Sequence, residues 1–460
     1  MPSVIEKTVD NMLCVGCGVC AALCPESNLL MQWNSYGELN PVKIRNCKHD
    51  CGFCLSICPS QTTERNDEDV ISKTLYHAQG TQHCPEVGYY LTTGCGGVSD
   101  KERRAECASG GLATWFLAQL LKRDIVDAVI CVNHCYDGTK LFHYTVAETI
   151  EDVLDSKGSS YYPNELSEVL KHILENDRRY AIIALPCCMK AIRLAQKQNK
   201  KLNSRIVVTA ALVCGRMKTS VFTDYCSWLS KLDGKPTEVQ YRITDLSAPP
   251  LPHRYVFRQK QQDGTEIKTQ ITHKVGTEIY HSSLFGLTSC RFCDDMFGEC
   301  ADISFMDAWL HEYTSTEPRG TSLFVTRTNL SAEIIDSGIQ SRELAVSYLP
   351  VQKIIQSQSG LRRRERISYM QTLHRNDGFV PPEKRFTKTQ VHSLSKIDAR
   401  RYAKLDLKSR IVWEAVNHDF AKYHRWVSRQ RKLSFPARAA AFGIRMSFAA
   451  VRKIVRILKN

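Results

Sequence analysis

The sequence contains no run of eighteen apolar residues, the length that a membrane-spanning helix needs, so we expect no membrane span. Its first residues, 1–7, include no apolar core segment, so we expect no secretory signal. Without an oxidising destination, the 20 cysteines are not expected to form disulfides. They predict instead metal binding or redox chemistry in the cytoplasm.

Charge is distributed unevenly along the chain, whose net charge is +14. Residues 388–460 contain 18 Lys and Arg against 4 Asp and Glu, so this segment carries the whole excess and residues 1–387 are balanced. No aromatic-rich recognition module accompanies the basic segment, so nucleic acid is not an expected partner.

Two copies of one cysteine pattern occupy the first sixty residues. Each copy has three closely spaced cysteines and a fourth directly before a proline; they are Cys14, Cys17, Cys20 and Cys24, then Cys47, Cys51, Cys54 and Cys58. In two-cluster ferredoxins, the cysteine before the proline ligates the other cluster. We therefore expect one 4Fe–4S cluster on Cys14, Cys17, Cys20 and Cys58. The second is expected on Cys47, Cys51, Cys54 and Cys24.

The alternative interpretation of these eight cysteines is a zinc ribbon or a disulfide framework. Zinc sites use two CxxC pairs and do not need the longer run. The second copy departs from the pattern by one residue, because three residues separate Cys47 from Cys51. Residues 10–62 resemble a bacterial two-cluster ferredoxin, which is an α+β domain.

From about residue 105, apolar patterns typical of helices and strands alternate. Helices are expected over 112–121, 164–176 and 188–199, and strands over 127–132, 180–185 and 205–213. This alternation predicts an α/β domain with a mostly parallel sheet. Around 238–275 the pattern predicts an antiparallel hairpin insertion that turns at Asp263 and Gly264.

Several cysteines follow predicted strands in this domain. Cys187 and Cys188 follow one strand, Cys214 follows the next, and Cys290, Cys293 and Cys300 come later. The carboxyl ends of neighbouring parallel strands lie together, so these thiols are expected to converge. A CxxC pair with two such thiols would complete a third cluster. Cys131, Cys135 and Cys226 are interpreted as small core residues.

The chain from about 105 to 330 resembles the family of coenzyme F420 hydrogenase/dehydrogenase beta subunits. The segments that carry the resemblance are 109–114, 157–161, 185–190, 212–214, 290–309 and 320–327. The resemblance implies FAD beside a third 4Fe–4S cluster held by Cys187, Cys214, Cys290 and Cys293, with Cys188 or Cys300 as substitutes. It also implies hydride exchange between the flavin and a deazaflavin or another organic partner.

A phosphate of the flavin is expected at the helix that starts after Ser109, Gly110 and Gly111, because bare N–H groups there bind anions. The proposed flavin-binding set is Ser109, Gly110, Gly111, Thr114, Lys157, Ser159, Ser160, Tyr161 and Asp307. Trp309 is either part of the substrate mouth or a core residue. No catalytic acid stands out, although His134 and His281 lie near candidate loops.

The end of the chain, residues 436–460, predicts an amphipathic cationic helix. Its apolar stripe comprises Ile444, Phe448, Val451, Val455 and Leu458, beside a row of arginines and lysines. The stripe suits either an anionic membrane surface or docking on the chain itself or on a partner protein.

The expected organisation is a ferredoxin domain over 1–75, a linker over 76–104, the flavin and iron–sulfur domain over 105–387 and a basic helical tail over 388–460. The predicted function is an oxidoreductase that couples one-electron transfer through clusters to hydride transfer at flavin N5, with coenzyme F420 or a similar substrate. The alternatives are a ferredoxin-dependent reductase of a pigment or surface-polysaccharide pathway and a non-catalytic relay subunit. The expected partners are a redox protein or ferredoxin and a small hydride donor or acceptor.

Overall fold

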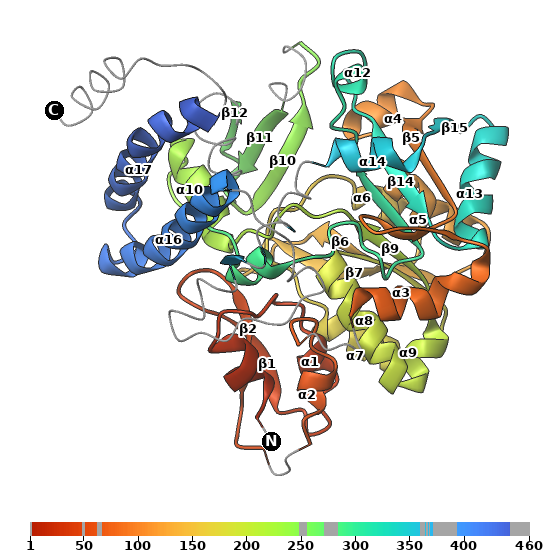
Figure 1. The fold of residues 1–460 in the computed structure, drawn as a ribbon, viewed down its shortest axis with the longest axis horizontal. Coiled ribbons are helices and arrows are strands. Elements are labelled where there is room, and N and C mark those ends of the chain that lie inside the picture. The colour runs from red at the N-terminus through yellow and green to blue at the C-terminus, as the bar shows by residue number, and fades with distance from the viewer. Residues whose placement is uncertain are drawn as a thin grey trace.

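The computed structural model describes residues 2–47, 51–61, 67–247, 255–270, 284–358, 364, 367, 369–370 and 393–441. Figure 1 shows the N-terminal segment, in red, below an α/β body. The C-terminal helices, in blue, lie to one side of the body, next to a small separate sheet.

The N-terminal segment repeats one local structure around its two cysteine runs. Its elements are η1 (Ile5–Val9), α1 (Val19–Ala22), an antiparallel pair of β1 (Leu29–Trp33) and β2 (Leu39–Lys43), and α2 (Phe53–Ser56). Gly18 and Gly52 occupy equivalent places as N-caps of α1 and α2, and both have a positive φ, of 76° and 62°. Glycine adopts this conformation without steric cost, so each run turns sharply into a short helix that carries its third cysteine.

The body contains an eight-stranded sheet of order β15-β5-β14-β13-β9-β8-β6-β7. Its strands are β5 (Thr92–Val98), β6 (Ala128–His134), β7 (Phe142–Ala147), β8 (Tyr180–Ala184), β9 (Ile206–Leu212), β13 (Ile303–Asp307), β14 (Ser322–Thr326) and β15 (Leu344–Tyr348). Strands β13, β9, β8 and β6 are parallel neighbours, whereas the other four pairings are antiparallel. The α/β prediction is confirmed, and the sheet is mixed, with five of these eight strands running in one direction.

Side chains of the central strands alternate between two cores, as the period of two in a strand requires. Ile130, Tyr180 and Ile182 face a core shared with α1, α7 (Ser167–Glu175), α8 (Pro186–Gln198) and α9 (Lys200–Arg205). Val129, Ala181 and Ile183 face the opposite core with α5 (Leu112–Lys122), α6 (Ile150–Asp155) and α13 (Asn329–Gln340). Because Val19, Leu23 and Ile57 belong to the first core, the N-terminal segment shares that core with the body.

The remaining elements surround this sandwich. They are α3 (Glu68–Tyr76), η2 (His77–Gln79), the β3 (Gln82–Cys84) and β4 (Gly88–Tyr90) pair, α4 (Lys101–Glu106), α10 (Ser220–Leu229), η3 (Thr288–Phe292), α12 (His311–Thr314) and α14 (Val351–Ser357). A separate antiparallel sheet consists of β10 (Glu238–Thr244), β11 (Tyr255–Lys260) and β12 (Glu266–Gln270). The predicted hairpin with its turn at Asp263 and Gly264 is therefore present between β11 and β12.

Residues 76–104 do not form a simple linker, because β5 lies inside the main sheet between β15 and β14. Strand β5 is rich in glycine, a residue that is uncommon in strands, so its sequence does not predict a strand. The glycines allow close packing: a Cβ at Gly94 would lie 2.6 Å from the Phe324 ring, and one at Gly96 would lie 2.1 Å from the Ala345 carbonyl oxygen. Small residues are needed where other chain segments approach this closely.

Two C-terminal helices, α16 (Ser393–Ala415) and α17 (Phe420–Ala441), pack against the rest of the chain. The Tyr36 hydroxyl lies 2.6 Å from Ser409 Oγ, and Trp413 Nε1 donates to the Ser35 carbonyl at 3.1 Å. A buried ion pair joins Arg291 to Asp406. Residues 406–413 of α16 therefore hold the β1–β2 loop against the body. The apolar stripe expected at 444–458 lies outside the described residues.

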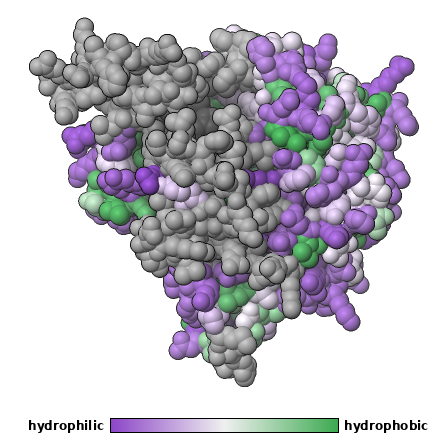
Figure 2. All heavy atoms as spheres, viewed as in Figure 1, coloured by the Kyte–Doolittle hydropathy of each residue, from purple (hydrophilic) through white to green (hydrophobic). Residues whose placement is uncertain are grey.

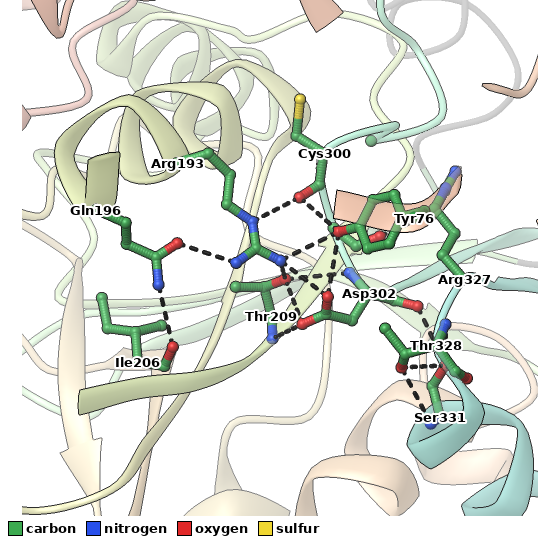
Figure 3. A network of polar contacts seen from close by, with 12 residues as sticks. Tyr76, Arg193, Gln196, Ile206, Thr209, Cys300, Asp302, Arg327, Thr328 and Ser331 are labelled. Atoms are coloured by element: carbon green, nitrogen blue, oxygen red, sulfur yellow. Dashed lines mark hydrogen bonds and ion pairs between the residues drawn. The ribbon is translucent and has the colours of Figure 1, made fainter. Parts of the chain in front are cut away.

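A buried network connects the segments that surround the predicted third cluster (Figure 3). Arg193 of α8 forms an ion pair with Asp302 at 2.9 Å and donates to the Cys300 carbonyl at 2.9 Å. The other Asp302 oxygen accepts from the backbone N–H and hydroxyl of Thr209 on β9, both at 2.8 Å. The Tyr76 hydroxyl of α3 lies 3.1 Å from the Asp302 carboxylate. One ion pair thereby fixes α3, α8, β9 and the entrance to β13.

The described surface in Figure 2 is mainly hydrophilic over the α/β body, with scattered apolar spots. Among the helices that the structure describes, none combines the length and apolar character needed to cross a membrane.

We expect Asp302→Ala to lower the free energy of unfolding by about 3–5 kcal/mol, because it leaves the buried Arg193 charge unpaired. Asp177→Ala is the matched control, since Asp177 also pairs with an arginine but its side chain is 91% exposed. The control is expected to cost less than about 1 kcal/mol. Denaturant titration followed by circular dichroism measures both, and equal effects would contradict a structural role for the Asp302 pair.

Candidate redox centres

The four thiols predicted to share the first cluster line one pocket. They are Cys14, Cys17, Cys20 and Cys58. The Gly16 N–H donates to Cys14 Sγ at 3.3 Å, and Thr8 Oγ1 lies 3.7 Å from Cys58 Sγ. Burial raises the pKa of Cys14 to about 12, and repulsion from Cys58 adds to this effect. Such thiols ionise readily only when a metal replaces their protons, so the pocket fits an iron–sulfur group.

The second predicted set lies beside the first, nearer the surface. Asn28 links two of its members: its backbone N–H donates to Cys24 Sγ at 3.3 Å, and its side-chain amide donates to Cys47 Sγ at 3.6 Å. Burial raises the pKa of Cys54, and repulsion from Cys51 and Cys24 contributes. Cys47 and Cys51 are exposed. The structure therefore gathers the four thiols into one neighbourhood; residues 48–50 of the longer loop lie outside the described residues.

The candidate third set meets where the N-terminal segment touches the body. Cys187 and Cys293 line one cavity, together with Leu13, Val15, Pro59, Ser60, Glu68, Lys190, Ser289, Phe292, Asp294 and Asp295. A hydrogen bond with Cys188, burial and repulsion from Cys290 raise the pKa of Cys187.

Cys214 reaches this region through the loop that follows β9. Its N–H donates to the Met296 carbonyl at 3.3 Å, and the Met217 N–H donates to Cys290 Sγ at 3.4 Å. These two bonds align the Cys214 loop with the loop that carries Cys290 and Cys293. The topology thus brings the loop that carries Cys214 beside the loop that carries Cys290 and Cys293.

The two substitute thiols are placed differently from Cys187. Cys188 and Cys300 are buried, and neither lines the cavity. Burial and repulsion from Asp295 and Glu68 raise the pKa of Cys300. Of these three thiols, only Cys187 lines the cavity.

The core interpretation of three further cysteines holds only in part. Cys131 is buried between the sheet and α5, and Cys226 packs at the edge of the aromatic core around α10. Cys135 is exposed, so its prediction as a core residue was wrong. The reason is local: β6 ends at His134, and Cys135 begins the surface turn that the Asp137 carboxylate closes.

Within the described part of the chain, no three His, Cys, Asp or Glu side chains are grouped closely enough to hold a single metal ion. A zinc site needs ligands that converge on one ion at about 2.3 Å. In a 4Fe–4S cube each thiolate binds a different iron, so the sulfurs stand farther apart.

The candidate flavin site centres on Arg242 of β10, which sequence reasoning missed. Arg242 forms an ion pair with Asp307 at 2.9 Å and donates to the Ala108 carbonyl at 2.8 Å and to the Tyr255 hydroxyl at 2.6 Å. Its guanidinium lies 4.4 Å from the centre of the Tyr255 ring. Burial opposes the charge, but Asp307 and the two tyrosines, Tyr161 and Tyr255, raise the pKa of Arg242. The arginine therefore remains a cation.

Two predicted flavin residues, Asp307 and Tyr161, meet at this arginine. The Tyr161 hydroxyl lies 3.5 Å from Arg242, and the Trp309 ring centre lies 5.8 Å from the guanidinium. Trp309 is 43% exposed, so it is not a core residue. A lone arginine in a strand gives no local signal, which is why only the folded chain reveals it.

The Ser109–Gly111 turn lies next to Ala108 and is tightly held. Gly111, with a φ of 79°, is the N-cap of α5, and Ser109 does not cap the helix, because its hydroxyl donates to the Thr321 carbonyl at 2.8 Å. A Cβ at Gly110 would lie 2.3 Å from the Gly96 carbonyl oxygen. Thr114 lies in the first turn of α5 and is partly exposed.

The other predicted phosphate-binding residues form an open loop after α6. The Lys157 ammonium pairs with Glu106 at 2.7 Å. Ser159 and Ser160 are partly exposed, and Ser160 Oγ accepts from the Asn164 amide at 3.2 Å. The structure therefore places Lys157 beside α4 and the Ser109 turn, without joining it to Arg242.

A flavin ring fits the Arg242 group for one specific reason. The Arg242 side chain is 10% exposed, and its Nε–H has no partner among the described residues. A buried donor without a partner costs about 1–3 kcal/mol, so a ligand that offers an acceptor would be favoured there. Aromatic side chains beside it suit a planar ring that carries such acceptors.

Comparison with known proteins now decides the family. The family model described as "Coenzyme F420 hydrogenase/dehydrogenase, beta subunit N-term" matches residues 95–171. The model of the C-terminal part of the same family matches residues 177–351. The chain belongs to the family of coenzyme F420 hydrogenase/dehydrogenase beta subunits. As a member of this family, it has relatives that are oxidoreductases and subunits of oxidoreductases.

Three relatives of this family member are informative. It is 26% identical over 194 residues to the coenzyme F420-dependent sulfite reductase of Methanocaldococcus jannaschii, a match that spans 42% of the chain and 26% of the reductase. It is 20% identical over 220 residues to one of the subunits of the F420H2 dehydrogenase of Methanosarcina mazei, spanning 46% of the chain and 56% of that relative. It is 34% identical over 56 residues to an uncharacterised ferredoxin of M. jannaschii, spanning 12% of the chain and 71% of the ferredoxin.

We expect Cys187→Ser to lower the iron content of the anaerobically purified protein by about four per chain, the content of one cube. The adjacent change Cys188→Ser is the matched control and is expected to leave iron unchanged, because the predicted ligand is Cys187 and the Cys188 side chain is buried. Iron analysis and electron paramagnetic resonance measure both. Loss of iron in the Cys188 variant alone would assign the ligand to Cys188.

Proposed function

We propose that this chain is an iron–sulfur flavoprotein oxidoreductase that couples one-electron transfer through three 4Fe–4S clusters to two-electron hydride transfer with an organic substrate. The observation that carries the proposal is the meeting of two cysteine sets at one contact. Cys187 of the third set packs against the core cluster that contains Cys17 of the first set. Val15 and Pro59, which follow Cys14 and Cys58, line the cavity that contains Cys187 and Cys293. Segments from different parts of the chain thus form adjoining redox sites.

The exposure of the cysteines suggests the order of electron transfer. The set with the exposed Cys47 and Cys51 would meet an external redox protein or ferredoxin. The buried set around Cys17 and Cys20 would come next, followed by the set around Cys187 and Cys293. The match to an uncharacterised ferredoxin of M. jannaschii supports a ferredoxin module at the N-terminus. The repeated turns at Gly18 and Gly52 are consistent with the two cysteine runs that we propose for it.

The flavin, which we propose to be FAD, would lie at the carboxyl edge of the sheet. The turn at Ser109, Gly110 and Gly111 with Thr114 would hold a phosphate, assisted by Lys157, Ser159 and Ser160. Arg242 would orient the ring by donating from its unpartnered Nε–H, and Asp307 would hold the arginine in place. When bound, a flavin accepts two electrons as hydride and releases them singly, which clusters alone cannot do.

Coenzyme F420 is the proposed substrate, because relatives in the family include an F420-dependent reductase and one of the subunits of an F420H2 dehydrogenase. The second candidate is a relay role without chemistry of its own, since the dehydrogenase relative is by its name one part of an assembly. A reductase of a pigment or surface-polysaccharide pathway is a third. The half-exposed Trp309 beside Arg242 favours a site that receives an organic ring over a pure relay.

We expect the protein purified without air to contain about twelve irons, from three cubes of four, and one flavin per chain. With reduced ferredoxin as electron donor, the isolated protein is expected to reduce coenzyme F420. The loss of F420 absorbance measures this reaction. Reduction of another acceptor in place of F420 would support the biosynthetic reductase. Electron transfer only in the presence of a partner enzyme would support the relay, and the absence of iron would reject the proposal.

We expect Arg242→Gln to weaken flavin retention at least tenfold while leaving iron content unchanged, because it removes the cation and its Nε–H from the ring site. Arg258→Gln is the matched control. Arg258 lies on the neighbouring strand β11 and pairs with Glu238 and Glu266 away from the site. Flavin release on dilution, followed by fluorescence, measures both variants, and equal flavin loss would contradict a specific role for Arg242.

A further inference from the structure

A fully buried ion pair lies between the first and third cysteine sets. The Lys190 ammonium of α8 lies 3.2 Å from the Glu68 carboxylate of α3, and the two side chains are 1% and 5% exposed. Placing both charges away from water is costly, and apolar residues would often fill such a space at lower cost. A buried ion pair at this position therefore calls for an explanation beyond packing.

The pair borders both cluster sites. Glu68 and Lys190 line the cavity that contains Cys187 and Cys293, which is also lined by Pro59, the residue directly after Cys58. Pro59 and Ser60 directly follow Cys58, and Val15 directly follows Cys14. Because these three residues line the same cavity as Glu68 and Lys190, segments that carry thiols of the first set reach the ion pair.

The charges around this cavity are unequal. Among the described residues that line it are three carboxylates, Glu68, Asp294 and Asp295, and one ammonium, Lys190. Each electron that enters a cluster adds one negative charge, which a nearby cation stabilises and a nearby carboxylate destabilises. These effects are large here because charges interact strongly where water is excluded.

We propose that Glu68 and Lys190 are positioning residues that set the reduction potentials of the two clusters on either side of them. Lys190 stabilises the reduced state of both, and Glu68 limits that stabilisation, so that an electron arriving from the first cluster does not remain trapped at the contact. This inference rests on the proposed function, because it needs clusters on Cys14, Cys17, Cys20 and Cys58 and on Cys187, Cys214, Cys290 and Cys293.

The pair also joins two parts of the chain. Glu68 begins α3, which follows the N-terminal cysteine segment, whereas Lys190 belongs to the helix that starts at Pro186 beside Cys187. The pair therefore exists only when α3 is docked on α8. The charge balance between the clusters is thus tied to the docked arrangement through which electrons would pass.

Glu68→Gln is the decisive variant, because it keeps the shape of the side chain and removes one negative charge. We expect the midpoint potentials of the first and third clusters to rise, with at least a tenfold change in the reduced-to-oxidised ratio at a fixed potential, or about 59 mV for one electron. The second cluster, on Cys24, Cys47, Cys51 and Cys54, is an internal reference and is expected to shift less. Potentiometric titration of the full chain, followed by electron paramagnetic resonance, measures all three.

Asp69→Asn is the matched control, since Asp69 is the next residue of the same helix and is exposed. The same charge change in water is expected to shift no potential by as much, because solvent screens it. Lys190→Met should lower the potentials of the first and third clusters. If it fails to fold, the two α3 variants still decide the question.

The outcomes separate this inference from the proposed function. Normal iron content with unchanged potentials in Glu68→Gln would overturn the inference and leave the function intact. An equal shift of all three clusters would also overturn it. Wild-type protein without cluster signals would instead reject the proposed function.

Discussion

The ion pair between Arg193 and Asp302 is the constraint on which the candidate redox centres depend. Burial opposes the charge, but Tyr76 and Asp302 raise the pKa of Arg193, so the arginine stays a cation inside the protein. Its guanidinium must then be surrounded by acceptors, and these come from α3, β9 and the chain before β13 (Figure 3). The same segments lead to Cys187, Cys214 and Cys293. A requirement for charge compensation therefore fixes the relative positions of thiols that lie far apart in the sequence.

The proposed clusters and the proposed flavin would lie toward opposite faces of the sheet. On the face of α7 and α8, the N-terminal segment shares a core with the body and brings the first cysteine set against Cys187. On the opposite face, α5 begins at the Ser109–Gly111 turn, and Asp307 holds Arg242 at the edge. Strand alternation produces this division, because neighbouring residues of one strand point to opposite sides. Electrons would thus cross the edge of the sheet between the proposed clusters and the proposed flavin.

Sequence reasoning succeeded where a signal was local and failed where partners were distant. The strands over 127–132, 180–185 and 205–213 agree with β6, β8 and β9 to within two residues, because each is a continuous apolar run. Strand β5 was missed because its glycines resemble a linker, although neighbouring strands require them. Cys135 was assigned to the core, but the end of β6 leaves it exposed. Arg242 and the Glu68–Lys190 pair had no sequence signal, since each has its partners in other elements.

The sequence by itself determined the cysteine spacing, the alternation of helices and strands and the family. These are short-range properties: three residues between thiols, or a period of two in a strand, restrict the backbone without reference to the rest of the chain. Only the tertiary structure decided that β5 lies inside the sheet, that the first and third cysteine sets adjoin, and that residues 406–413 hold the β1–β2 loop. Such contacts depend on which segments, distant in the sequence, pack against each other and on which buried charges form ion pairs. Spacing along the chain does not encode either choice.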